Sequence, residues 1–441
     1  MAGGAEAHAR MLVNKLKPHV DVEVATTTAR DYWTWENELS AGLTWVDHVA
    51  VRRFPVDKPR SRTFKVHERR AFRDGHGLDD ETRFVDAQGP VTPDLAEHLF
   101  RHGREYDHVL FFTYIYWTTL FGLPIVPERS LLVPTAHDEP AIGLSLYRRV
   151  FHLPRAIAFN THEERAMVHR RFANARIPNE VVGVGVDLPA DLDALPSHGA
   201  LSSGSHDALP EHGSLSSGGP DALPEHGSLS SGRPDDPTGL RPATAARAAI
   251  AARAERFRAK HSLEGPIFLY LGRIVESKGL QDLWDLWGKW RSPAAPRATL
   301  VLAGHREMEI PRRADIRYVG EVSEDEKWDA FAACTALLVP ERLQSLSLVT
   351  LEAWSVGRPV ICPAAAPVLA SMSRRASAGV PYRSSLEFAE ICELLVERPE
   401  LADRLGRAGR DFVARTYTWP VVVEKYLDLF AEVRARNAVP S

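Results

Sequence analysis

The sequence predicts an α/β protein with two Rossmann-like, doubly wound domains that face each other across a cleft. Two observations lead to this prediction. Short, nearly continuous apolar runs alternate with helical patterns, and the alternation occurs twice, on either side of a low-complexity segment. Such runs are typical of parallel strands that helices bury on both faces. The length of 441 residues also exceeds what one ordinary core accommodates.

The candidate elements follow this rhythm along the chain. In the first half the expected strands are Asp21–Thr27, His48–Phe54, His108–Thr113, Ser130–Ala136, Ala156–Thr161 and Val181–Asp187. In the second half they are Ile267–Arg273, Ala298–Gly304, Ile316–Gly320, Ala336–Pro340 and Pro359–Cys362. Helical patterns between them include Ser323–Cys334, Leu348–Val356 and Leu386–Arg398.

Composition narrows the class of protein. A hydrophobic content of 44% and a charged content of 25% are typical of globular proteins, and the net charge of −4 argues against a nucleic-acid partner. Cys334, Cys362 and Cys392 fit neither a disulfide framework nor metal-ligand spacing, which indicates a reducing compartment. The sequence shows no signal peptide and no apolar run long enough to span a bilayer. We therefore expect a cytoplasmic protein, and peripheral contact with the inner face of the membrane stays open.

The segment between the two halves is a repeat. Three consecutive copies of a fourteen-residue unit run from Asp193 to Pro234, rich in Gly, Ser, Pro and His and poor in apolar residues. This composition favours a disordered linker over 190–240, while metal binding by its histidines is a less favoured alternative. The expected domains are then 1–189, completed by a C-terminal helix within 416–436, and 241–415.

The start of the chain departs from the usual pattern of this fold. Gly3 and Gly4 lead directly into a helix, whereas such a glycine turn normally follows the first, central strand of the sheet. Without that strand two neighbouring strands would keep unpaired backbone groups. We expect that the true start lies upstream or that this copy is truncated; a merely flexible terminus is the alternative.

Two stretches place polar residues where parallel strands end. In Leu269–Leu280, Arg273 follows a strand that ends at Gly272, and Lys278 lies where a helix begins, so the two cations suit a diphosphate. Taken alone, they could equally be a surface pair flanking a strand.

The second stretch, Val339–Trp354, combines a hydroxyl-rich loop with a helix start, which is an anion site of another kind. Ser345 and Ser347 keep the loop small, and Glu352 could accept both hydroxyls of a ribose. An exposed helix acid without a partner is the alternative for Glu352.

With these motifs the sequence resembles glycosyltransferase family 4, retaining enzymes with the GT-B fold. The family pattern Pro-Ser-x-x-Glu-Gly-Phe-Gly-Leu-Val-x-Leu-Glu-Ala corresponds to Pro340–Ala353, and its Gly-x-Pro-Val to Gly357–Val360. Its Gly-Arg-x4-Lys-Gly is met by Gly272-Arg273 and Lys278-Gly279. Further matches are Gly3–Glu6, Val133–Pro140, Val182–Asp187 and Val319–Lys327.

The resemblance implies a role for each matching position. Arg273 and Lys278, beside Gly272, would hold the donor diphosphate, Glu352 would bind the ribose, and His137 would face the donor sugar, although a lone histidine is more often a satisfied core residue. The phosphate and the donor sugar would contact the backbone of Ser345, Leu346, Ser347, Leu348 and Val349. The backbone at Val322 would bind the base. Gly3 and Gly4 would lie near the phosphates and the acceptor. The helix at Thr416–Phe430 would cross back to the N-terminal domain.

The resemblance further implies sugar transfer from a UDP-, GDP- or dTDP-sugar to a glycan, lipid-linked or small-molecule acceptor, with retention of configuration and without cofactor or metal. Gln344 replaces the first acid of the family pattern, which contacts the donor sugar. Loss of the charge would cost roughly 1–1.5 kcal/mol of binding, which corresponds to about a tenfold lower rate. Alternatively, the change marks a different donor sugar. A degenerate relative that binds nucleotide or a partner without turnover, and a nucleotide-sugar epimerase, stay as alternatives. The basic run Pro59–Gly75 is expected to be a solvated flexible loop, with service to an anionic or lipid-linked acceptor as the alternative.

Overall fold

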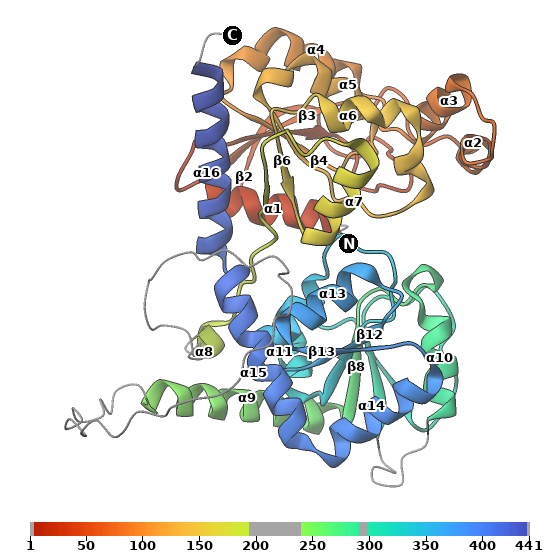
Figure 1. Ribbon diagram of the computed structural model, residues 1–441, viewed down its shortest axis with the longest axis vertical. Helices are drawn as coiled ribbons and strands as arrows, with labels where there is room; N and C mark the ends of the chain where they lie inside the picture. The colour runs from red at the N-terminus through yellow and green to blue at the C-terminus, as the bar shows by residue number, and fades with distance from the viewer. Residues whose placement is uncertain (1–3, 194–239, 291–297, 439–441) are drawn as a thin grey trace, which may run out of the picture.

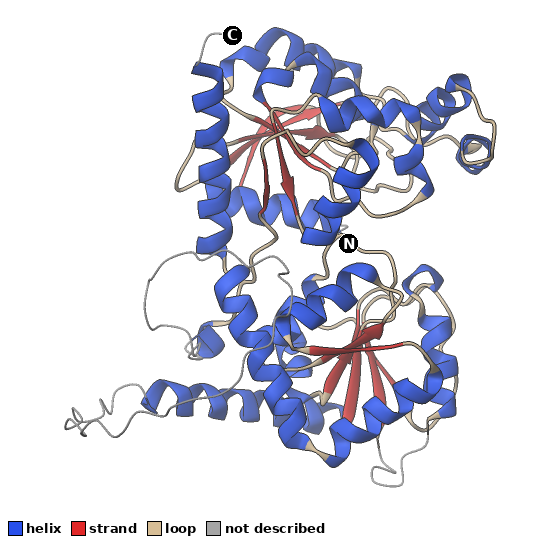
Figure 2. Cartoon of the chain, in the orientation of Figure 1, coloured by secondary structure: helices blue, strands red, loops and turns tan. Residues whose placement is uncertain are grey.

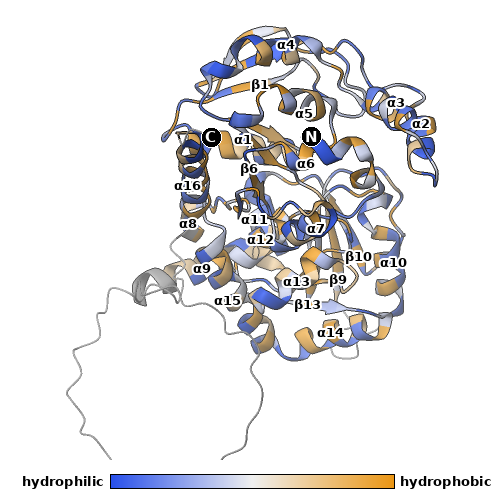
Figure 3. Cartoon of the chain, turned by 45° about the horizontal axis from the view of Figure 1, so that its top comes forward, coloured by the Kyte–Doolittle hydropathy of each residue, from blue (hydrophilic) through white to orange (hydrophobic). Residues whose placement is uncertain are grey.

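The computed structural model describes residues 4–193, 240–290 and 298–438, which form two α/β domains (Figure 1). The predicted linker falls mostly on residues 194–239 and therefore lies outside the described residues. In Figure 3 the outer helices carry both hydrophilic and hydrophobic colours, as expected of amphipathic helices with one face on a sheet.

The C-terminal domain contains one parallel six-stranded sheet in the order β10-β9-β8-β11-β12-β13. The strands are β8 Ile267–Leu271, β9 Thr299–Ala303, β10 Ile316–Gly320, β11 Ala336–Leu338, β12 Val360–Pro363 and β13 Gly379–Tyr382. The helices are α9 Leu240–His261, α10 Leu280–Lys289, α11 Glu324–Ala333, α12 Leu348–Ser355, α13 Pro367–Ala376, α14 Ser385–Glu397 and α15 Pro399–Thr416, with the 3₁₀ turn η6 Glu276–Lys278. The strand order reverses between β8 and β11. In doubly wound sheets ligands bind at the carboxyl ends of the strands at such a reversal.

The N-terminal domain contains two smaller sheets. β1 Glu23–Thr27, β3 Val49–Phe54 and β2 Gly42–Val46 form the first, in that order, with β2 antiparallel. β4 Val109–Phe112, β5 Ser130–Val133, β6 Ala156–Phe159 and β7 Asn179–Val181 form the second, all parallel. Its helices are α1 Gly4–Leu16, α2 Phe64–Ala71, α3 Leu78–Gln88, α4 Pro93–His102, α5 Trp117–Gly122, α6 Arg148–His152, α7 His162–Phe172 and α8 Ala190–Asp193, with 3₁₀ turns η1 Gly103–Glu105, η2 Leu123–Ile125, η3 Pro127–Arg129, η4 Pro140–Gly143 and η5 Ser145–Tyr147.

The two N-terminal sheets are not hydrogen-bonded to each other in the part of the chain that the structure describes. β1 has β3 as its one strand neighbour, and β4 has β5. Ala25, in the middle of β1, is exposed, whereas every residue of β5 and β6 is buried. Among the described residues, β1 and β4 therefore each pair with a strand on one side alone.

The C-terminal helix α16, Trp419–Ala438, returns to the N-terminal domain and runs along it (Figure 2). Its buried face, which includes Val422 and Tyr426, shares one hydrophobic cluster with Leu12 of α1 and Leu131 of β5. Apolar side chains at helical spacing thus close the core from the far end of the chain. The predicted crossover is confirmed.

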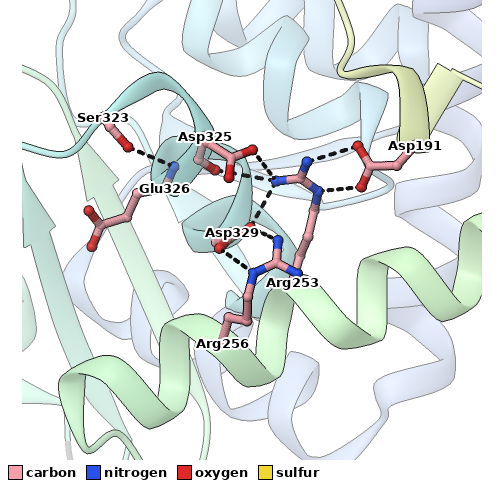
Figure 4. Close-up of polar contacts among 7 residues, drawn as sticks. All are labelled: Asp191, Arg253, Arg256, Ser323, Asp325, Glu326 and Asp329. Atoms are coloured by element: carbon pink, nitrogen blue, oxygen red, sulfur yellow. Dashed lines mark hydrogen bonds and ion pairs between the residues drawn. The ribbon is translucent and has the colours of Figure 1, made fainter.

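A buried arginine connects the two sides of the linker region (Figure 4). The guanidinium of Arg253 in α9 is 6% exposed and donates to Asp191 of α8 at 2.7 Å. It also donates to Asp325 at 2.9 Å and Asp329 at 2.8 Å, both in α11. The hydrogen bond to Asp191 and those to the other two carboxylates raise the pKa of Arg253 above its ordinary value. α8 and α9, which flank residues 194–239, are therefore fixed to the same helix.

Some sequence predictions for the elements were incomplete or wrong. The strands β2 and β13 were not predicted, and the run Val181–Asp187 contributes only Val181 to a strand, although Val186 bridges Thr418. The basic run Pro59–Gly75 is not a flexible loop, because α2 occupies Phe64–Ala71. The helices predicted at Ser323–Cys334, Leu348–Val356 and Leu386–Arg398 are present to within one residue at each end.

Candidate functional site

The loops that follow β8 and β11 meet at the strand-order reversal of the C-terminal sheet. Gly279 has a φ of +75°, and a Cβ at this position would lie 2.8 Å from the carbonyl oxygen of Pro340. Only glycine permits this conformation and this close approach together. The packing brings Lys278, at the end of the first loop, beside Glu341, at the start of the second.

Lys278 and Glu341 form an ion pair at the centre of this region. The Nζ of Lys278 lies 2.7 Å from both carboxylate oxygens of Glu341, and the two side chains are 30% and 19% exposed. The charge of Glu341 also contributes to raising the pKa values of Arg273 and His137. Sequence reasoning missed Glu341, although its position directly after the strand that ends in Leu-Val-Pro was the available signal.

Arg273 reaches from the C-terminal domain to the N-terminal domain. Its Nη1 donates to the hydroxyl of Tyr32 at 3.4 Å and lies 3.9 Å from a carboxylate oxygen of Glu307. The Tyr270 hydroxyl donates to the carbonyl oxygen of Arg273 at 2.6 Å, which fixes the backbone at the end of β8. Burial lowers the pKa of Arg273, but Tyr32 and the nearby acids outweigh it, so the net shift is upward. The guanidinium is charged and only loosely paired.

The loop before α12 contacts both domains. Leu346 packs against the core of the C-terminal domain and against the cluster around α16. The Oγ of Ser345 accepts a bond from Asn160 Nδ2 in the N-terminal domain at 3.5 Å. At the helix start the N–H groups of Leu348 and Val349 donate to no described group, as expected for the first turn of a helix. These donors, next to Ser347, are available to an anion.

Gln344 lies in the same loop and is partly buried. Its side chain forms no hydrogen bond with the residues that the structure describes. The amide is therefore available to a ligand, but the structure gives it no specific partner.

Glu352 is only partly exposed and is paired, so the alternative of an exposed helix acid without a partner is wrong. Its Oε1 accepts a 2.7 Å bond from Nζ of Lys327, and the side chains are 17% and 13% exposed. Burial raises the pKa of Glu352, and Lys327 opposes this rise. Lys327 belongs to α11, directly after the loop that carries Val322. The structure records a bond to Oε1 alone, which leaves Oε2 for a hydroxyl donor.

His137 lies in the turn after β5 and is partly exposed. Its Nε2 is 3.4 Å from Glu139, whose other oxygen accepts a 2.6 Å bond from the Tyr114 hydroxyl. Burial lowers the pKa of His137, but the bond to Glu139 and the charges of Glu139, Glu164 and Glu341 together outweigh it, so the net shift is upward. The buried Glu164 accepts the N–H of Ala136 at 2.5 Å and so holds the preceding residue in place. His137 is thus a positioned group at the domain interface.

The two glycines predicted near the phosphates are described only in part. Gly4 is the first residue of α1, and a Cβ there would meet nothing within 4 Å. Gly3 lies outside the described residues. Within the ranges that the structure describes, no three His, Cys, Asp or Glu side chains form a metal-binding group, and no helix is long and apolar enough to cross a bilayer.

The assembled arrangement can bind a phosphorylated ligand. Arg273, Lys278 and the free N–H groups at the start of α12 lie on the loops that follow β8 and β11, at the strand-order reversal. His137 belongs to the other domain, and the charge of Glu341 helps to raise its pKa. Fixed cations and N–H dipoles of this kind stabilise a diphosphate as negative charge develops on it.

Solved structures define the class of fold. The chain is similar to sucrose-phosphate synthase from Thermosynechococcus elongatus, with a TM-score of 0.62 and 16% identity over 99% of this chain and 94% of that one. It is also similar to Anabaena Alr3699/HepE in complex with UDP and glucose, with a TM-score of 0.60 and 12% identity over 98% and 96% of the two chains. WaaG, a glycosyltransferase involved in lipopolysaccharide biosynthesis, gives a TM-score of 0.57 and 13% identity over 98% and 96%. At these identities the likeness shows the fold, which is GT-B, as predicted.

The C-terminal domain also has sequence relatives. Residues 252–412 match the family model of glycosyl transferases group 1. A stretch of 128 residues is 33% identical to D-inositol 3-phosphate glycosyltransferase from Nocardioides sp. (strain ATCC BAA-499 / JS614) and spans 28% of each protein. The family match lies within the C-terminal domain, and the relative is matched over 28% of its own length, so the likeness holds for this part of the chain.

Proposed function

We propose that the protein is a retaining glycosyltransferase of family 4 that moves a sugar from a nucleotide-sugar donor to an acceptor. The observation that carries the proposal is the convergence of Arg273, Lys278 and the N-terminus of α12 at the strand-order reversal of the C-terminal sheet. A glycosyltransferase with the GT-B fold must stabilise the diphosphate of its donor. The two cations and the helix N–H groups are suited to this role.

The proposed chemistry is electrostatic. Negative charge develops on the diphosphate as it leaves, and Arg273, Lys278 and the free N–H groups of α12 would stabilise it. Oε2 of Glu352 would accept hydrogen bonds from the ribose hydroxyls. The backbone at Val322 would contact the base, and His137 would donate a hydrogen bond to the donor sugar. The acceptor would attack from the face that the diphosphate leaves, without a protein nucleophile.

The donor and acceptor classes follow from the same proposal. Solved relatives of the fold are described in complex with UDP-glucose, and in complex with ADP and acarbose. We therefore place UDP-sugars first among the donors, followed by GDP- and dTDP-sugars, with a glycan or lipid-linked acceptor and no metal. The reaction would take place in the cytoplasm, with peripheral membrane contact where the acceptor is lipid-linked.

A donor screen tests the proposal. Thermal unfolding is measured with UDP-, GDP- and dTDP-sugars, since a ligand that binds the folded state raises the melting temperature by an amount that grows with the logarithm of one plus the ratio of ligand concentration to Kd. One donor class should stabilise the protein, and Lys278→Ala should weaken that donor roughly tenfold or more, because a charged hydrogen bond is lost. Lys289→Ala, an exposed lysine at the end of α10, is the matched control. Stabilisation by none of the donors, or equal effects of both variants, contradicts the proposal.

Gln344 offers a second, independent test. If it occupies the position where the family acid contacts the donor sugar, Gln344→Glu should raise the transfer rate by about tenfold or change which sugar is preferred. Initial rates with glucose-, galactose- and N-acetylglucosamine-linked donors measure both outcomes. Unchanged rates and unchanged preference would remove Gln344 from the site.

A further inference from the structure

Arg60 is a partly buried cation without an acidic partner. Its side chain forms no hydrogen bond or ion pair with the residues that the structure describes, and its Nε is buried without a partner. Burial lowers the pKa of Arg60, and Tyr116, Tyr32 and the charges of Glu68 and Asp31 oppose this only in part; neither acid forms an ion pair with Arg60. Buried polar groups are nearly always hydrogen-bonded, so this one requires an explanation.

Stacking explains only part of its environment. The Cζ of Arg60 lies 4.7 Å from the ring centre of Phe64 and 5.8 Å from that of Trp33. Such contacts stabilise the face of a guanidinium. Its N–H groups point outward in the plane and still need acceptors. The cluster thus holds the planar group in place and leaves its hydrogen-bonding edge free.

The cluster lies at the edge of the N-terminal sheets that faces the candidate donor site. Tyr32 follows β1, Arg60 follows β3, and Tyr116 follows β4, so all three leave carboxyl ends of parallel strands, as His137 does after β5. The Tyr32 hydroxyl accepts the bond from Arg273 of the other domain. Arg60 thus belongs to the N-terminal domain, and Tyr32, which helps to raise its pKa, contacts Arg273 of the C-terminal domain.

An exposed aromatic surface lies next to the free cation. Trp33 is 54% exposed, and its ring lies 4.7 Å from that of Tyr32. On the other side Trp35 packs edge-on against Tyr116 at 5.2 Å. A flat apolar ring beside a guanidinium edge suits a ligand with an apolar face and an anionic group.

We propose that Arg60, Tyr32, Trp33 and Tyr116 form the acceptor subsite and that the acceptor carries a phosphate or carboxylate group bound by Arg60. The proposal rests on the proposed transferase function. The guanidinium fork matches both anions in two-point geometry. The donor diphosphate is assigned to two other cations, Arg273 and Lys278. It therefore does not explain why the Arg60 guanidinium has no hydrogen-bond partner.

The test is calorimetric titration of the full chain with the donor site filled by UDP. The probes are glucose 6-phosphate, glucuronate and glucose, and vesicles that contain phosphatidylinositol distinguish a lipid headgroup from a soluble sugar. At least one anionic probe should bind the wild-type protein more tightly than glucose. Arg60→Gln should weaken it roughly ten- to a hundredfold, because a charged two-point contact is lost. Arg62→Gln, an exposed arginine two residues along, should leave binding unchanged.

The outcomes separate this proposal from the proposed function. UDP binding, measured first, tests the donor site. If UDP fails to bind, the anion titration is repeated in Lys278→Ala, which removes the donor cation and leaves Arg60 in place. Anion binding that is lost in Arg60→Gln and kept in Arg62→Gln supports the subsite. Equal binding by wild type and Arg60→Gln, an equal loss in Arg62→Gln, or no preference of the wild type for any anionic probe overturns it.

Discussion

Replacing Glu341 by glutamine should tighten the binding of a nucleoside diphosphate. In the structure Lys278 bonds both oxygens of Glu341 at 2.7 Å. To hold a diphosphate, Lys278 must exchange this carboxylate for phosphate oxygens, and the displaced carboxylate then lies beside a second anion. Glu341→Gln keeps the shape of the side chain and removes its charge. The variant therefore lowers both the cost of breaking the ion pair with Lys278 and the repulsion between residue 341 and the bound diphosphate.

The magnitude follows from the environment of the pair. A charged hydrogen bond contributes about 1.5–3 kcal/mol, and partial exposure of both side chains places the net gain toward the lower end. A gain of about 1.4 kcal/mol corresponds to a tenfold lower Kd for UDP. Isothermal titration calorimetry at physiological ionic strength measures it directly.

Glu307→Gln is the matched control. Glu307 lies 3.9 Å from Arg273 and is 37% exposed, so its removal should change the Kd by no more than a few-fold. An unchanged or weaker affinity of Glu341→Gln for UDP would refute the argument that the carboxylate competes with phosphate.

Two further predictions concern stability. Burial lowers the pKa of His8 to about 4, so the folded state keeps His8 neutral while the unfolded chain takes up a proton below 6.5; stability is therefore lost as pH falls through this range. Denaturant titrations of the wild type should show a loss of unfolding free energy between pH 7 and 5, and His8→Phe should remove about 2 kcal/mol of that loss. An identical pH dependence of stability in the two proteins would count against the role given to His8. Arg253→Met leaves the buried Asp329 carboxylate without its deepest partner and should lower the free energy of unfolding by about 3 kcal/mol. The half-exposed Arg256→Met should cost about 1 kcal/mol or less, and equal losses in the two variants would disprove the role given to burial.

Most of the fold could be predicted from the sequence because buried parallel strands are visible as apolar runs. β8 and β9 are almost entirely buried, and their residues are correspondingly apolar. β2 could not be found this way, since Leu43 and Trp45 in this edge strand are exposed. In the basic run that follows β3, α2 forms with a single buried residue, Ala71, so it has almost no apolar stripe to recognise.

The candidate site could be predicted only where a residue follows a recognisable strand. Arg273 and Lys278 could be predicted because they lie in the loop that follows the recognisable strand β8. Their partners were not, because Glu341 and Tyr32 are brought to them by packing between loops and between domains that no local pattern encodes. The unpaired state of Arg60 is likewise a property of its three-dimensional surroundings, and the sequence showed only a basic run.

Acceptor-dependent release of nucleoside diphosphate, followed with the donor selected by the thermal screen, tests the central claim most directly. The account predicts release in the wild-type protein that rises with acceptor concentration, and a loss of roughly tenfold or more in both Arg273→Ala and Lys278→Ala, because each variant removes a charge that stabilises the leaving diphosphate. Release that is as fast in these variants as in the wild type would contradict it.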